Sequence, residues 1–269
     1  MKVTISDARA GTPALPKLNL VDLSHPFSIH TPGWANYPPV KVYYFQRLSS
    51  HDIVAQYIET PLHVSTHLDA PMHAVPGGCD MASIPLSRLF GEGVVVDISD
   101  QVHDWSFITP KMITDRVEVR RGDILLYYTG YKRFYPGEAT ENEPRYFLRH
   151  PGGSRELAEW IVKMELAWTG VDCASADHPL NTTIRRLRPE LVDEFEETTG
   201  KRVRDVFPPE DLFVMHRVPF PHNIVHVENL GGDVEQILNR RCLLGVFPWK
   251  FVGGEASIAR VVAFLPDGS

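Results

Sequence analysis

One stretch of eleven residues, 63–73, constrains this chain more than any other. It reads His-Val-Ser-Thr-His-Leu-Asp-Ala-Pro-Met-His and so holds three histidines and one aspartate. Imidazole nitrogens and carboxylate oxygens are the standard ligands of zinc and similar divalent ions. His63, His67 and Asp69 are therefore candidate ligands, and His73 is either a further ligand or a histidine that moves protons. Ordinary turn or core histidines explain any one of these residues, but not all four together.

The spacing of these residues dictates the local backbone. Pro61 and Pro71 flank the stretch and leave too little room for a stable helix. An extended strand would carry His63 and Asp69 about 20 Å apart, at about 3.3 Å per residue. One metal ion cannot collect both side chains across that distance. If the site is real, the chain must turn between them, and we expect the turn at 65–66.

Composition limits the kinds of partner. The chain has 269 residues, of which 43% are hydrophobic and 23% charged, and its net charge is −7. A soluble globular protein with a sizeable core is expected. The negative charge gives no attraction to nucleic acid or anionic lipid, so a small-molecule substrate is the expected partner. Without a secretory layout at the start or an apolar run near the roughly 20 residues that span a bilayer, we expect a cytoplasmic protein. The three cysteines are far apart and suit buried packing.

The order of the expected elements indicates one α/β domain, 1–269, with a mixed sheet and flanking helices. Residues 123–129 are the clearest buried strand, and Ser154 caps an amphipathic helix to about residue 166. The long polar and aromatic connection 130–153 is typical of a lid or a subunit contact. Further strands are expected at 19–24, 40–48, 53–58, 93–98, 167–173, 224–230, 242–249 and 257–265, and helical segments at 109–117, 189–198 and 233–239.

Other residues carry weaker signals. Trp34 lies in an irregular segment rich in proline and glycine, and is either a pocket wall or a loop anchor. Thr66 can support a ligand through its hydroxyl. Cys79 has no evident activating partner and is a poor candidate nucleophile. The pair 177–178 either orients something in the pocket or ends a strand. The basic cluster Arg185, Arg186 and Arg188 either attracts a carboxylate on the substrate or is a solvated surface.

The eleven-residue stretch resembles the signature of the cyclase family of metal-dependent hydrolases, which includes bacterial kynurenine formamidase and isatin hydrolase. The family pattern is His-x-Gly-Thr-His-x-Asp-x-Pro-x-His, and only Ser65 departs from it, standing in place of glycine. Supporting similarities are Asp-Leu-Ser-His-Pro at 22–26, Thr-Pro-Gly-Trp at 31–34, Thr-Gly-Val-Asp at 169–172 and Val-Glu-Asn-Leu at 227–230.

This resemblance implies a set of roles. His63, His67 and Asp69 would be metal ligands, His73 the general acid/base, and His216 and Glu228, twelve residues apart, would complete the site. From the residues alone the late histidine stays open, because alternation on a strand places His226 and Glu228 on one face and His222 is also near. The resemblance also implies a swivelling β/β/α type of fold and a homodimer or higher oligomer. We expect the segment 130–153 to form that contact.

The expected function is hydrolysis of an amide, lactam or lactone carbonyl in a small aromatic or cyclic substrate. One or two divalent ions, zinc or manganese, would lower the pKa of a bound water, and Asp69 would bridge two ions. The motifs of zinc proteases, serine hydrolases and phosphate-binding loops are missing from the sequence. Two alternatives are a metal-dependent cyclase or isomerase and a non-catalytic metal-binding assembly protein.

Overall fold

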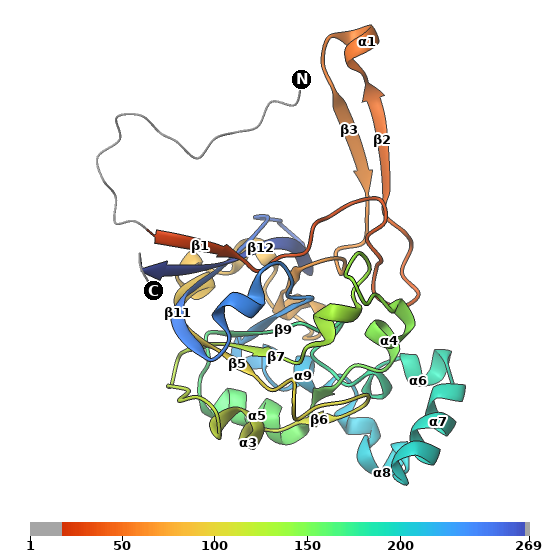
Figure 1. Ribbon diagram of the computed structural model, residues 1–269, viewed down its shortest axis with the longest axis vertical. Coiled ribbons are helices and arrows are strands. Elements are labelled where there is room, and N and C mark those ends of the chain that lie inside the picture. The colour runs from red at the N-terminus through yellow and green to blue at the C-terminus, as the bar shows by residue number, and fades with distance from the viewer. Residues whose placement is uncertain (1–17, 267–269) are drawn as a thin grey trace.

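The largest unit of the computed structural model, which describes residues 18–266, is a sheet that closes into a barrel (Figure 1). Its strand order is β1-β12-β11-β5-β7-β9-β10-β4, and β4 pairs back onto β12. Seven strands therefore form the ring and β1 extends it at β12. The strands are β1 (Leu18–Asp22), β4 (His67–Asp69), β5 (Phe90–Asp97), β7 (Ile124–Tyr128), β9 (Trp168–Val171), β10 (Val225–Glu228), β11 (Arg240–Pro248) and β12 (Ala256–Pro266).

The sheet is mixed, as the sequence predicted. Strands β5, β7, β9 and β10 run parallel to one another, whereas β4, β11 and β12 are antiparallel to their neighbours. The expected strand positions agree with the structure to within about three residues at each end, whereas β4 and two further strands of two residues each were not expected. Closure of the barrel depends on that three-residue strand, because it pairs with both β10 and β12.

Two hydrophobic clusters lie on opposite faces of the sheet. The inner cluster takes side chains from all seven ring strands, including Leu68, Trp168, Val227 and Val261. Since successive side chains on a strand point to opposite faces, the neighbours of Leu68 on β4 and of Val227 on β10 face out of the barrel. The outer cluster lies between β5, β7, β9 and the helices that cover them.

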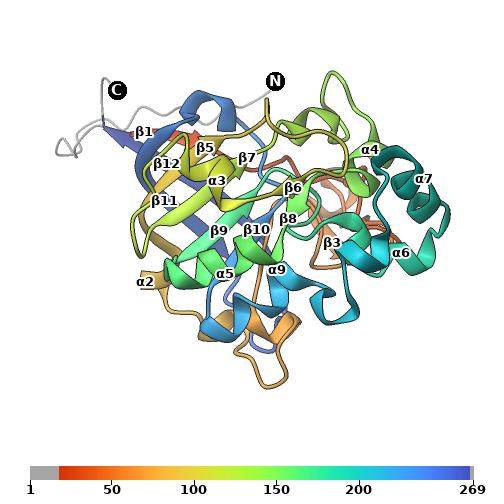
Figure 2. The same cartoon turned by 90° about the horizontal axis from the view of Figure 1, so that it is seen from below.

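Short helices cover the outer face (Figure 2). The predicted helix after Ser154 is confirmed as α5, where the Ser154 hydroxyl accepts from Leu157 N and Leu157, Ala158 and Ile161 are buried. No helix within residues 18–266 has the length and apolar character needed to cross a membrane. The helices are α1 (Leu48–His51), α2 (Leu86–Leu89), α3 (Pro110–Thr114), α4 (Glu143–Leu148), α5 (Arg155–Lys163), α6 (Ile184–Leu187), α7 (Glu190–Thr199), α8 (Val203–Val206) and α9 (Val214–Arg217).

Seven 3₁₀ turns connect these elements in the described part of the chain. The first, η1, carries His73 at its end, and η7 lies within the predicted helical turn 233–239. They are η1 (Pro71–His73), η2 (Met81–Ser83), η3 (Tyr131–Phe134), η4 (Pro179–Asn181), η5 (Pro209–Asp211), η6 (Phe220–His222) and η7 (Val234–Ile237).

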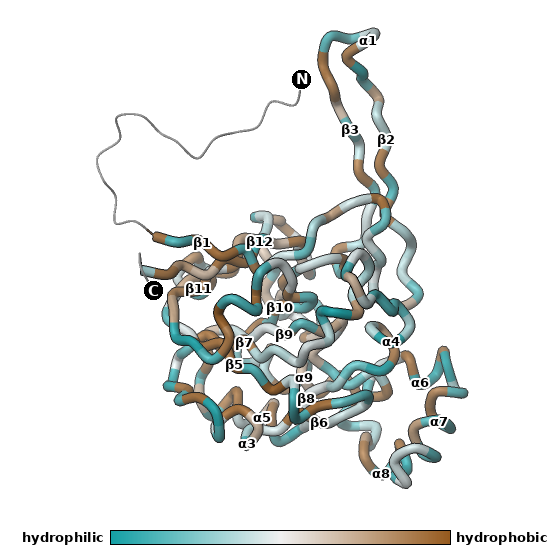
Figure 3. The backbone as a smooth tube through the Cα atoms, viewed as in Figure 1, coloured by the Kyte–Doolittle hydropathy of each residue, from teal (hydrophilic) through white to brown (hydrophobic). Residues whose placement is uncertain are grey.

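A two-stranded hairpin projects from the body of the molecule (Figure 1). It pairs β2 (Lys41–Gln46) with β3 (Ala55–Glu59), and α1 forms its tip. Hydrophobic stretches recur along it (Figure 3). Its exposed apolar and aromatic residues are Tyr43, Tyr44, Phe45, Leu48, Ile53, Val54, Tyr57 and Ile58.

The connection 130–153 contributes to the core of the chain. Its aromatic side chains Tyr131, Phe134, Tyr135, Tyr146 and Phe147 are buried in the outer cluster. These rings are therefore part of the chain's own core, and they are not available to a second subunit. The polar composition of the segment concealed this burial, because the aromatic residues are spaced among charged and glycine residues.

A second small sheet pairs β6 (Phe107–Ile108) with β8 (Gly152–Gly153) close to the barrel. Gly152 and Gly153 allow a close approach here. A Cβ atom on Gly152 would lie 2.1 Å from His178 N, and one on Gly153 would lie 2.2 Å from Met215 Sδ. The two glycines thus let the segment after β9 and helix α9 each pack closely against β8, and both segments contribute to the site described next.

Candidate metal centre

A backbone turn at Ser65 shapes the central stretch. Ser65 has φ +54°, in the left-handed region, and this confirms the predicted turn. Glycine adopts this conformation without a steric penalty, which explains why the family pattern has glycine at this position. The Ser65 hydroxyl donates to His25 O at 3.3 Å. The turn directs His63 toward the same centre as His67 and Asp69, which lie at the two ends of β4.

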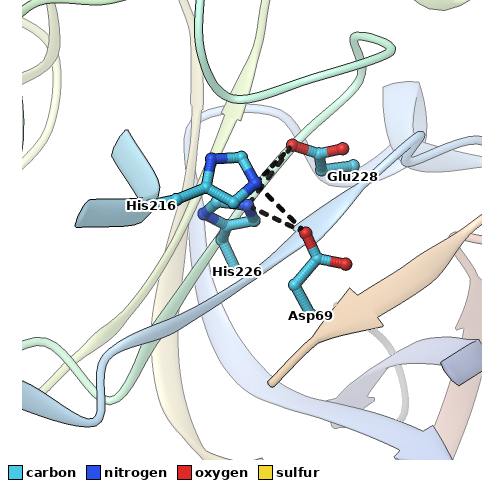
Figure 4. Close-up of side chains that lie close together, drawn as sticks. All are labelled: Asp69, His216, His226 and Glu228. Carbon is cyan, nitrogen blue, oxygen red and sulfur yellow. Dashed lines mark ion pairs between the residues drawn. The ribbon is translucent and has the colours of Figure 1, made fainter. Parts of the chain in front are cut away.

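A first group of four potential ligands consists of Asp69, His216, His226 and Glu228 and gathers at one carboxylate oxygen of Asp69 (Figure 4). His216 Nε2 and His226 Nε2 lie 3.3 Å and 3.4 Å from Asp69 Oδ2, and His226 Nε2 lies 3.3 Å from Glu228 Oε1. The four candidate ligand atoms, one from each residue, lie within 4.8 Å of one another, and all four residues are buried. This arrangement can hold a divalent ion.

A second group surrounds the other oxygen of Asp69. His63 Nδ1 lies 3.1 Å from Asp69 Oδ1, and His67 Nε2 lies 3.4 Å from the same atom. His67 Nε2 is also 3.6 Å from Glu228 Oε2. Potential ligand atoms of His63, Asp69 and His73 again lie within 4.8 Å of one another. Asp69 therefore presents one oxygen to each group.

Several of these atoms have no hydrogen-bond partner although they are buried. They are His67 Nε2, Asp69 Oδ1, Asp69 Oδ2 and His226 Nε2. Leaving a buried polar atom unpaired costs about 1–3 kcal/mol, and more for a charged group. Four such atoms converging on one point are the pattern expected of ligands whose partner is a metal ion. The nitrogen and oxygen donor set fits zinc or manganese.

Further contacts orient the ligands. His216 Nδ1 donates to Asp177 Oδ2 at 2.6 Å, which leaves its Nε2 directed at Asp69. His67 Nδ1 donates to Ser65 O at 2.9 Å and leaves its Nε2 free in the same way. Glu228 Oε1 accepts from Ser175 Oγ at 2.9 Å and from Ala176 N at 2.8 Å. Such outer contacts set the tautomer and direction of a metal-binding histidine.

The electrostatics show how strongly the site attracts positive charge. Burial opposes ionisation of Glu228, but the nearby His226, whose Nε2 lies 3.3 Å from Oε1, outweighs it and lowers the pKa of Glu228 to about 2. Burial likewise disfavours charge on His216, yet its hydrogen bond to Asp177 and the nearby Asp69 carboxylate raise its pKa to about 10. Burial is outweighed at Asp69 too, where His63 and His67 hold its pKa well below the ordinary value. The pKa values of His63 and His226 are raised in the same way, whereas burial lowers that of His67. The buried carboxylates thus favour positive charge at this site, which a divalent ion can supply.

A cavity of about 700 Å³ opens onto this cluster. Trp34 and Tyr37 lie in its wall with their rings 5.7 Å apart, and His73 lies at the cavity with a quarter of its side chain exposed. Arg217, next to His216 on α9, supplies a positive charge to the wall. Further lining residues are Met72, Val75, Ser175, Thr183 and Phe213.

The structure settles where the three possible late histidines lie. His216 and His226 both face Asp69, whereas His222 is exposed and lines a separate pocket with Cys79 and Arg88. Alternation along β10 correctly placed His226 beside Glu228. His216 comes from a different element, α9, so no local pattern identified it, and only the family spacing did.

The remaining sequence candidates have other surroundings. The Thr66 hydroxyl contacts main chain, donating to Asn229 O at 2.5 Å and accepting from His25 N at 2.9 Å. It thus acts on the backbone next to Glu228 and not on a ligand side chain. Cys79 is partly exposed near Asn223. Of the basic cluster, Arg185 donates to Phe207 O and Arg188 pairs with Glu190, away from the cavity.

Two carboxylates were missed or undervalued at the sequence level. Asp177 orients His216, which is one of the two alternatives considered for the pair 177–178. Glu255 was not singled out at all, and its carboxylate lies between His63 and His73. Nothing in the local sequence Gly-Gly-Glu-Ala marks it as part of a site, because the residue reaches the centre only through the pairing of β12 with β4.

The structure is thus a closed mixed barrel with a buried cluster of histidines and carboxylates at a cavity. This cluster is able to hold a divalent metal. The chain belongs to the cyclase family: the family model described as "Putative cyclase" matches residues 21–178, more than half of the chain. The matched region includes the eleven-residue stretch and ends before His216. Among curated proteins, none matches this chain significantly.

Solved structures share the fold at low sequence identity. Isatin hydrolase A from Labrenzia aggregata, bound to benzyl benzoate, has a TM-score of 0.73 at 18% identity, covering 93% of this chain and 94% of that one. Isatin hydrolase A from Ralstonia solanacearum has a TM-score of 0.71 at 19% identity, covering 96% and 100%. A predicted metal-dependent hydrolase from Bacillus stearothermophilus has a TM-score of 0.64 at 20% identity, covering 92% and 98%.

Proposed function

We propose that this protein is a divalent-metal-dependent hydrolase that cleaves an amide, lactam or lactone bond in a small aromatic or cyclic substrate. The observation that carries the proposal is the convergence of buried, unpartnered ligand atoms from His67, Asp69 and His226 beside a cavity. The isatin hydrolases among the fold relatives support the choice of a cyclic amide.

Six residues would hold the metal: His63, His67, Asp69, His216, His226 and Glu228. A bound divalent ion supplies a water of lowered pKa and polarises the carbonyl of the substrate. The two oxygens of Asp69 face different histidine pairs, so these residues would be able to hold one or two zinc or manganese ions, with Asp69 contributing to both groups. The contacts of Asp177, Ser65 and Ser175 would keep the ligands in place before the metal enters.

His73 would carry the proton. Its ring is partly exposed at the cavity and its centroid lies 4.2 Å from that of His63, so it would lie beside a substrate that occupies the cavity. An imidazole can take a proton and return it near neutral pH, a role that contributes about 10²–10⁴-fold in rate. The product of hydrolysis is a carboxylate, which Arg217 in the cavity wall can meet.

Metal analysis combined with a substrate panel tests this function. The protein is stripped with a chelator, reloaded with zinc or manganese, and assayed on aryl formamides, isatin-like lactams and lactones. We expect stoichiometric metal and restored hydrolysis of at least one class. A protein that binds no stoichiometric divalent metal, or that no metal activates on any of these substrates, would refute the proposal.

We also propose that the chain forms a homo-oligomer through the hairpin β2–β3. An isolated two-stranded hairpin is marginally stable in water at best, and this one exposes eight large apolar or aromatic side chains. A second copy of the chain would cover them. The burial of the aromatic residues in 130–153 shifts the proposed contact from that segment to the hairpin.

A further inference from the structure

Glu255 lies between two histidines that have different proposed roles. It immediately precedes β12, and its Oε2 atom lies 2.6 Å from His63 Nε2 and 2.8 Å from His73 Nδ1. About a third of its side chain is exposed, whereas that of His63 is buried. The carboxylate is therefore one acceptor that two imidazoles share at the edge of the cavity.

Strand pairing fixes the position of Glu255. Its carbonyl oxygen accepts from Ala70 N at 2.9 Å, and the next residue, Ala256, is opposite Asp69 in the β12–β4 register. The pairing that closes the barrel thus places Glu255 and Asp69 on opposite sides of the His63 ring. His63 spans them, with Nδ1 toward Asp69 and Nε2 toward Glu255.

The contacts decide which nitrogen of each ring carries its proton. A carboxylate accepts hydrogen bonds and does not donate them, so His63 donates to Glu255 from Nε2 and His73 donates from Nδ1. His63 Nδ1 faces Asp69 Oδ1 at 3.1 Å, so a metal ion held by Asp69 would meet this nitrogen and displace the proton on it. His73 keeps its lone pair on Nε2, the nitrogen not engaged by Glu255. His63 would thereby be held as a ligand through Nδ1, and His73 as a proton acceptor through Nε2.

We propose that Glu255 is a positioning residue that sets the tautomers of His63 and His73 together, one for metal binding and the other for proton transfer. The role in proton transfer rests on the proposed function. The assignment for His73 does not, because it follows from the hydrogen bond that His73 Nδ1 donates to Glu255. A carboxylate that orients a catalytic or metal-binding histidine typically changes affinity or activity by about 10–100-fold when removed.

The first test needs no activity. Nitrogen-15 spectra of histidine-labelled, metal-free protein report which ring nitrogen is protonated. We expect Nδ1 protonation of His73 in the wild type and a mixture shifted toward Nε2 in Glu255→Ala. Glu194→Ala is the matched control, because Glu194 has a side chain of similar exposure that pairs with Arg149 away from the cavity. A His73 signal that is identical in Glu255→Ala and the wild type would overturn the proposal.

The second test uses metal affinity and turnover. For Glu255→Ala we expect metal binding, measured by chelator competition, to weaken about 10–100-fold, and kcat to fall with little change in KM. Glu255→Gln keeps a side-chain oxygen that can accept both bonds and should rescue most of the metal affinity. Circular dichroism and thermal melting verify that the variants fold.

A double-mutant cycle separates positioning from a general structural effect. If Glu255 acts on turnover through His73, Glu255→Ala should lower kcat no further in a His73→Ala background. Multiplicative losses would contradict the proposal. An active wild type with Glu255→Ala equal to Glu194→Ala would refute this inference alone, whereas an inactive, metal-free wild type would refute the proposed function.

Discussion

Ser65 shows how one residue departs from a family pattern without losing its backbone shape. A left-handed conformation costs a non-glycine residue about 1–2 kcal/mol, and Ser65 adopts it at φ +54°. The substitution Ser65→Gly removes that strain but adds about 0.5–1 kcal/mol of chain entropy in the unfolded state. We therefore expect Ser65→Gly to stabilise the protein by about 0.5 kcal/mol in urea unfolding. Ser65→Ala, which keeps the strain and loses the hydroxyl, should be the less stable variant; the reverse order would contradict this account.

His226 and His222 form a natural pair of variants, because only the first faces the cluster. His226 Nε2 is buried without a hydrogen-bond partner near Asp69 and Glu228, and His222 is exposed. We expect His226→Ala to weaken metal binding by more than about 100-fold, since losing a ligand exceeds the effect of losing an outer contact. His222→Ala should bind metal like the wild type. Equal affinities, measured by competition with a chelator, would exclude His226 as a ligand.

Among the elements of the fold, the hairpin β2–β3 is unusual because the rest of the described chain does not cover its apolar side chains. Its cross-strand pair Tyr43 and Tyr57 is half exposed on both sides. Placing charges there should disrupt a contact between subunits, because burying an unpaired charge is costly. We expect Tyr43→Asp combined with Tyr57→Asp to reduce the mass measured by light scattering to that of a single chain. Leu86→Asp, at an apolar position that is more exposed but outside the hairpin, should leave the mass unchanged. A wild type that is monomeric would refute the oligomer directly.

For the whole molecule, buried histidines predict how stability depends on pH. Burial lowers the pKa of His25 to about 3, of His150 to about 4 and of His178 to about 3. An unfolded chain binds protons at these residues near pH 6.5, so between pH 6.5 and 4 it holds up to three more protons than the native state. Stability should fall as pH drops through this window. Each histidine contributes a slope of up to about 1.4 kcal/mol per pH unit.

His216 acts in the opposite direction above that window. Its native pKa of about 10 exceeds the unfolded value, so its stabilisation is complete below pH 6.5 and is lost as pH rises toward 10. The metal-free protein should therefore be most stable near pH 6.5 in urea titrations. His25→Phe should reduce the acid slope by about a third, and His30→Phe, at an exposed position, is the control. A slope that His25→Phe does not change would refute the assignment.

Local sequence patterns determined much of this protein. The prolines around residues 63–73 excluded a helix, the distance between His63 and Asp69 required a turn, and alternation placed His226 beside Glu228. Strands such as β7 and helices such as α5 followed from apolar runs and caps. These features depend on backbone sterics and side-chain periodicity over a few residues, so they can be recognised without the fold.

The tertiary structure decided what depends on register between distant segments. Pairing of β4 with both β10 and β12 closed the barrel, brought Glu228 beside His67 and placed Glu255 against His63 and His73. The choice of His216 over His222 depended on how α9 packs near Gly153. The burial of the aromatic residues in 130–153 depended on a core that they share with other helices. A shift of one residue in strand pairing would turn these side chains to the other face. The candidate ligands of the central stretch were therefore visible in the sequence, but the partners that complete and orient them were not.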